Sequence, residues 1–142
     1  MLIKKEVYKK IIDYPREIPP EFGGALGGND GIISFMLFDE GQNNGKGCSY
    51  SPNVDVVNMQ IEQWLNAGID FMGLYHSHFF GVDTLSKGDI EYIGKIMNSV
   101  FEYINELYFP IVVMPERKLI AYKAIWTQGV VNIKKDVAKI VY

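Results

Sequence analysis

The sequence runs Gly73-Leu74-Tyr75-His76-Ser77-His78 and then, after seven further residues, Ser86-Lys87-Gly88-Asp89. These two segments contain both histidines of the chain. Side chains alternate between the two faces of a strand, so histidines separated by one residue share a face only if the backbone is extended. The aliphatic and aromatic run from residue 69 to 75 predicts such a strand. We therefore expect His76 and His78 to lie on one face at the end of a strand.

Apolar periodicity along the rest of the chain predicts a single domain spanning residues 1–142. Helices are expected around Val7, Ile11 and Ile12, which are interleaved with Lys4, Lys5, Lys9 and Lys10 and followed by Pro15, over 56–67 before Gly68, and from Lys87 to about Leu107. Strands are expected over 32–38, 110–114, 119–126 and, less regularly, in the tail 130–142. Turn signals at 29–31 and 40–45 flank the strand 32–38 and indicate a hairpin. Helices that alternate with hairpin-linked strands predict an α/β (α+β) fold with a mixed sheet and flanking helices.

Composition excludes several classes of function. The chain has 142 residues, of which 48% are hydrophobic, enough for one core, and its net charge of −3 offers no basic stripe for nucleic acid. No apolar run is long enough to cross a bilayer and the N-terminus lacks a signal-type apolar region, so we expect a cytoplasmic protein without a membrane partner. The single cysteine, Cys48, agrees with a reducing compartment. Composition leaves the oligomeric state open.

Asp89 is the best candidate for a third metal ligand beside the two histidines. Catalytic zinc sites take three ligands from histidine and carboxylate side chains and leave a fourth position for water. The loop after His78 would bring the first turn of the next helix back to the imidazoles. Ser86 followed three residues later by an acid is also the pattern of a helix N-terminal cap, and the two roles are compatible. Asp83, inside the loop, is a rival ligand that we rank behind Asp89.

The spacing His-x-His, seven residues, Ser, two residues and Asp resembles the metal-binding signature of the JAMM family, zinc isopeptidases of the MPN-plus type. The segment from Pro20 to Gly28 resembles the family's upstream Glu followed by a Gly-rich strand, which implies that Glu21 is the catalytic acid/base. The order of elements is also similar and implies an MPN-like (cytidine-deaminase-like) architecture. Phe79 and Leu85 stand where many members have proline, which leaves the rigidity of the loop open.

The resemblance implies a zinc metalloprotease or isopeptidase, a hydrolase with one catalytic Zn²⁺ and its bound water. His76, His78 and Asp89 would hold the metal. Glu21 would move the proton and the Ser86 hydroxyl would stabilise the oxyanion. The implied substrate is the C-terminal tail of a ubiquitin-like or sulfur-carrier-like protein. Two alternatives remain, a non-catalytic MPN-type interaction module and a RadC-like domain.

Overall fold

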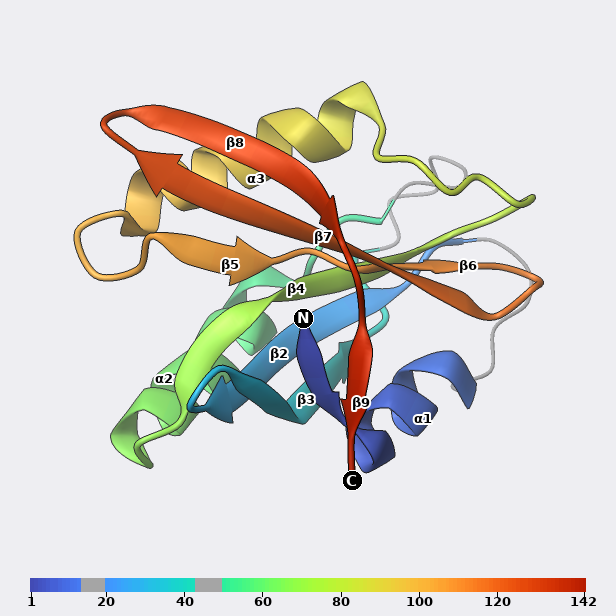
Figure 1. Cartoon of the computed structure of the whole chain (residues 1–142), viewed down its shortest axis with the longest axis horizontal. Helices are drawn as coiled ribbons and strands as arrows, with labels where there is room; N and C mark the ends of the chain where they lie inside the picture. The colour runs from blue at the N-terminus through green and yellow to red at the C-terminus, as the bar shows by residue number, and fades with distance from the viewer. Residues whose placement is uncertain (14–19, 43–49) are drawn as a thin grey trace.

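The structure is a computed structural model that describes residues 1–13, 20–42 and 50–142. These residues form one mixed sheet with three helices (Figure 1). In chain order the elements are β1 (Leu2–Lys4), α1 (Lys5–Asp13), β2 (Gly23–Asn29), β3 (Ile32–Asp39), α2 (Val54–Asn66), β4 (Asp70–His78), α3 (Lys87–Val100), β5 (Glu106–Tyr108), β6 (Ile111–Val113), β7 (Lys118–Thr127), β8 (Val130–Asp136) and β9 (Lys139–Val141). Three features of the sequence, Pro15, Cys48 and the end of the second turn signal at 43–45, lie outside the described residues.

The sheet confirms the predicted mixed topology. Its main path runs β5-β7-β6-β4-β2-β3-β1-β9, with β8 added to β7. β2 is antiparallel to both β3 and β4, whereas β4 is parallel to β5 and β6 and β1 is parallel to β3 and β9. Asp30 and Gly31 have φ values of 55° and 75°, the left-handed conformations of a tight hairpin turn, and they join β2 to β3 as predicted.

The two larger of three apolar cores among the described residues lie on opposite faces of this sheet. Val7 and Ile11 of α1 pack on one face against a core that includes Tyr75 of β4. Trp64 of α2 and Met97 of α3 belong to the core on the other face. The helices therefore cover both faces, α1 on one side and α2 with α3 on the other. Within the described residues, no helix is both long and apolar enough to cross a membrane.

A bulge in β4 shifts the alternation of its side chains between the two faces of the sheet, upstream of the histidines. Leu26 of β2 pairs with Gly73, but the next residue pairs with Phe71, so Met72 is an extra residue in β4. As a result, Phe71 and Leu74 both face the core of α2 and α3. Gly73 has φ 143°, and a Cβ there would collide with the carbonyl oxygen of Tyr108 in β5. Only glycine accommodates this backbone and this close approach.

Two predicted boundaries were wrong. The helix expected to reach about Leu107 ends at Val100, and Leu107 lies in β5, where it pairs with Ala124 of β7 and is 1% exposed. Apolar spacing continues through Ile104 at a helical interval, so periodicity did not reveal the change to a strand. Lys4, which we assigned to the first helix, belongs to β1, whose neighbours β3 and β9 satisfy its backbone groups.

Candidate metal centre

Three elements meet at the candidate site: the end of β4, the start of α3 and the segment that leads into β2. Antiparallel pairing aligns Gly23 of β2 with His76 of β4. The pairing extends one step further, because Ser77 donates its N–H to the carbonyl oxygen of Phe22 at 2.7 Å and its Oγ accepts the N–H of Phe22 at 2.9 Å. Residues far apart in sequence, Glu21 and the histidines, are thereby placed beside one another.

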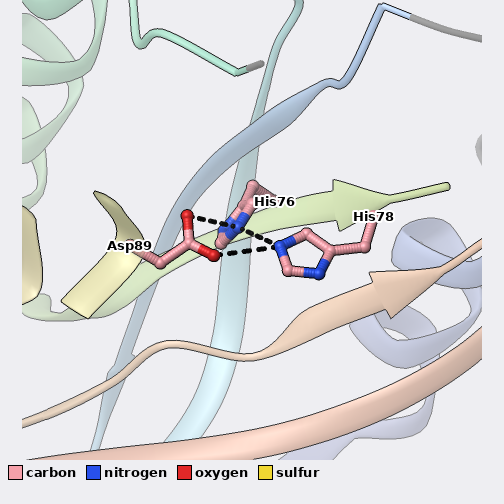
Figure 2. A group of neighbouring side chains, drawn as sticks. All are labelled: His76, His78 and Asp89. Atoms are coloured by element: carbon pink, nitrogen blue, oxygen red, sulfur yellow. Dashed lines mark hydrogen bonds and ion pairs between the residues drawn. The ribbon is translucent and has the colours of Figure 1, made fainter. Parts of the chain in front are cut away.

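His76, His78 and Asp89 point toward a common centre (Figure 2). The two Nε2 atoms are 2.9 Å apart. Oδ1 of Asp89 lies 3.2 Å from Nε2 of His76, and Oδ2 lies 3.0 Å from Nε2 of His78. As predicted, both histidines share one face of β4, and Ser77 between them is fully buried on the other.

The donor set fits a metal ion. Two imidazole nitrogens and a carboxylate oxygen are the ligands of catalytic zinc, with ligand atoms roughly 3.3 Å apart around a tetrahedral ion whose bonds are about 2.0–2.1 Å. The observed separations of 2.9, 3.0 and 3.2 Å need only a small opening to reach this value. Nδ1 of His78 lies 3.3 Å from the carbonyl oxygen of Val82, an orienting contact typical of metal-binding histidines. These three residues can therefore bind a metal ion.

The charges of these groups favour a cation at the same point. Burial opposes the charge on His78, but its hydrogen bond to Asp89 and the charge of that carboxylate outweigh burial and raise the pKa of His78 above its ordinary value. Burial also opposes the charge on Asp89, whereas hydrogen bonds from His76 and His78 hold the pKa of Asp89 well below its usual range. A negative carboxylate thus faces two imidazole nitrogens, an arrangement that a metal ion can complete.

Asp89 takes part in the N-terminal cap of α3 and at the same time faces the two histidines. Ser86 is the N-cap of α3: its Oγ accepts the N–H of Asp89 at 3.0 Å, and its own N–H donates to Oδ2 of Asp89 at 2.8 Å. This reciprocal capping box fixes the carboxylate in the orientation that faces the histidines. Ser86 is exposed and its hydroxyl proton remains available, because the cap uses only its oxygen as an acceptor.

Loss of the cap has a measurable cost. Ser86→Ala is expected to lower the free energy of unfolding by about 1 kcal/mol, because the N–H of Asp89 loses its acceptor. Ser86→Asn should restore most of that stability, since asparagine is an equally good N-cap. Urea denaturation of the two variants beside the wild type measures the difference. Equal stability of the alanine variant and the wild type would show that the capping box contributes nothing.

Glu21 lines the same cavity as the three candidate ligands and Ser86, a cleft of about 570 Å³. Its Oε2 accepts the backbone N–H of Tyr50 at 3.1 Å. Burial raises the pKa of Glu21 to about 7, although the neighbouring His78 and the Tyr50 N–H act in the opposite direction. A carboxyl that titrates near neutral pH is suited to accept and return a proton.

The loop between His78 and Ser86 is held without proline at either end, where Phe79 and Leu85 stand. Phe79 is 4% exposed and packs into the core on the α1 side. Hydrogen bonds to Met114 fix the loop's start, since Met114 donates to the carbonyl of His78 at 2.7 Å and accepts from Gly81 at 3.1 Å. Burial and backbone hydrogen bonds therefore constrain this end of the loop.

The rival ligand Asp83 is not part of the candidate metal cluster. It is exposed, and its carbonyl oxygen accepts the hydroxyl of Tyr122 at 3.0 Å. The structure therefore brings together Glu21 and the four residues of the spaced motif and leaves Asp83 aside.

The sequence did not predict a role for Tyr50. Its ring lies parallel to that of His76, with an interplanar angle of 10° and centroids 6.2 Å apart. It follows a polar, Gly-rich turn signal, where neither periodicity nor a motif marks it. Its position beside the metal centre depends on the path of the chain after β3, which apolar spacing does not encode.

Comparison with known proteins supports the fold. No family model and no curated protein sequence matches the chain. Among solved structures, the chain is similar to a protein from Desulfitobacterium hafniense solved in solution, with TM-score 0.63 and 16% identity over 99% of this chain and 93% of that one. It is also similar to the crystal structure of a JAB1/MPN domain protein from Archaeoglobus fulgidus, with TM-score 0.59 and 18% identity over 100% of both chains. The chain has an MPN/JAB1-like fold.

Proposed function

We propose that this protein is a zinc-dependent hydrolase that cleaves an amide or isopeptide bond at the C-terminal tail of a ubiquitin-like or sulfur-carrier-like protein. The observation that carries the proposal is the presence of Glu21 and Ser86 in the same cleft as His76, His78 and Asp89. A module that only binds partners has no need for a proton-transfer group and a hydroxyl donor beside a metal site. The MPN-like fold is compatible with this activity.

Each residue of the cleft has a different role in the proposed reaction. Zinc, when bound by His76, His78 and Asp89, would supply Lewis acidity and a water whose pKa is lowered to about 7. Glu21, with its own pKa raised by burial to about 7, accepts a proton at a carboxylate oxygen and donates it to the leaving amine. The hydroxyl of Ser86 donates a hydrogen bond to the carbonyl oxygen as negative charge develops on it.

A second cavity adjoins the cleft and extends the surface on which a substrate could lie. It measures about 890 Å³ and is lined by apolar residues of α2 and α3, among them Ile61 and Ile96. Pro52, Leu74 and Tyr92 line both cavities, so the groove meets the cleft at the candidate metal centre. A groove continuous with the cleft gives room for an extended chain beside the scissile bond.

The proposal predicts a chelator-sensitive amidase. A ubiquitin-like protein that ends in two glycines and carries an aminocoumarin amide at its C-terminus provides a fluorescent probe. The zinc-loaded protein should release the fluorophore, 1,10-phenanthroline should stop the release, and added zinc should restore it. The same fluorophore on a free amino acid serves as the control for the protein part of the substrate. The proposal fails if metal-loaded protein cleaves neither this probe nor a lysine-linked conjugate of the same protein.

A further inference from the structure

A buried carboxylate lies behind the candidate active site and has no role in the chemistry above. Asp39, the last residue of β3, is 6% exposed. Its Oδ2 accepts the hydroxyl of Tyr50 at 2.8 Å and the N–H of Asn53, the N-cap of α2, at 2.9 Å. Burial of a carboxylate is costly unless hydrogen bonds compensate it, so this residue is placed to hold its two partners.

Tyr50 connects Asp39 to two residues of the cleft, Glu21 and His76. Its backbone N–H donates to Oε2 of Glu21, and its ring lies parallel to the imidazole of His76. Burial and the nearby Asp39 carboxylate both raise the pKa of the Tyr50 hydroxyl, so it stays protonated and remains a donor. Tyr50 is therefore tied to a buried acid through its hydroxyl, donates to the proton carrier from its backbone N–H and lies with its ring beside a candidate ligand.

The fold makes room for this ring. A Cβ on Gly23 would lie 2.7 Å from ring atoms of Tyr50, and a Cβ on Gly41 would lie 3.1 Å away. The N–H of Gln42 donates to the carbonyl oxygen of Ser51 at 2.7 Å, which joins the chain on either side of Tyr50. Two glycines and a backbone hydrogen bond thus fit the tyrosine closely against β2.

We propose that Tyr50, anchored by Asp39, is a positioning residue that fixes the Glu21 carboxylate and the His76 ring for the reaction. This proposal rests on the proposed function for its effect on catalysis, but the hydrogen-bonded chain itself can be tested without any activity. Misplacement of a catalytic group by about 1 Å can cost on the order of 100-fold in rate. Loss of the hydroxyl anchor should therefore lower kcat and leave zinc content intact.

Tyr50→Phe tests the anchor, because phenylalanine keeps the ring and the backbone N–H and removes only the hydroxyl. We expect the amide of residue 50 to exchange with solvent about tenfold faster by NMR in the metal-free protein, since its segment is no longer tied to Asp39. In the zinc-loaded protein we expect kcat to fall about tenfold with KM unchanged. Tyr122→Phe, which removes another hydroxyl donor, the one that donates to the carbonyl oxygen of Asp83 away from both cavities, is the matched control and should change neither quantity.

Variants of Asp39 provide a second test of the same proposal. Asp39→Asn keeps an oxygen acceptor and should retain kcat within about threefold. Asp39→Ala should reproduce the lower kcat and the faster amide exchange of Tyr50→Phe. Melting temperatures report whether each variant folds. Unchanged amide exchange in Tyr50→Phe, or an unchanged kcat, would overturn the proposal. If the wild type shows no hydrolysis, the proposed function fails, and the exchange of the residue 50 amide alone then supports or overturns the positioning chain.

Discussion

His78→Ala is expected to abolish stoichiometric zinc binding and to reduce hydrolysis to background. His78 contributes one of three convergent ligand atoms, and its Nε2 lies within about 3 Å of both the His76 and Asp89 donors. Loss of an outer partner of a ligand already costs 10- to 100-fold in metal affinity, so loss of a ligand should weaken zinc binding by at least about 100-fold. Elemental analysis after dialysis gives the zinc content, and the fluorogenic probe gives the activity.

Two further variants make this test specific. Asp89→Ala should lose zinc in the same way, whereas Asp83→Ala should retain it, because Asp83 is exposed and lies outside the cluster. Circular dichroism shows that each variant is folded. Retention of stoichiometric zinc by folded His78→Ala, or loss of zinc from Asp83→Ala alone, would contradict the assigned ligand set.

Glu21→Gln should separate metal binding from catalysis. Glutamine keeps the shape of the side chain and an oxygen that accepts the Tyr50 N–H, but it does not take up a proton at neutral pH. General acid–base catalysis contributes typically 10²- to 10⁴-fold, so kcat should fall by about that factor while zinc content stays near one per chain. The variant is assayed with the fluorogenic probe at saturating concentration.

Glu40→Gln is the control for this substitution, because Glu40 is an exposed carboxylate one residue beyond β3. It should have the activity of the wild type. If Glu21→Gln is as active as Glu40→Gln with the same zinc content, the proton carrier is a different group.

The sequence predicted the candidate metal cluster because its geometry is local. Histidines two apart share a strand face whatever the rest of the chain does, and a Ser with an acid three residues later caps a helix by itself. The structure accordingly places His76, His78 and Asp89 together and gives Ser86 the cap contacts that the spacing indicates.

The position of Glu21 required more than local geometry. Its proximity to His78 depends on antiparallel pairing of β2 with β4, which the residues alone do not specify and which the family resemblance implied. The bulge at Met72 and the close approach of Gly73 to Tyr108 were likewise not predicted, because they depend on the neighbouring strands. Tyr50 illustrates the same limit, since its position follows from a contact with Asp39, 11 residues earlier in the chain.

Secondary structure was predicted where apolar periodicity and local propensity agreed. The strand from Lys118 to Thr127 and the helix that contains Trp64 follow the predicted pattern closely. β5 was missed because Ile104 and Leu107 fall near helical spacing after Val100, while pairing with β7 favours a strand. β1 and β9 are three residues each, and neighbouring strands determine segments of that length more than their own composition does.

X-ray absorption at the zinc K edge of the wild-type protein tests the central claim most directly. A site made by His76, His78 and Asp89 predicts one zinc per chain with two imidazole nitrogens and oxygen ligands at about 2.0–2.2 Å and no sulfur. Absence of bound zinc, or a sulfur shell near 2.3 Å that indicates ligation by Cys48, would contradict it.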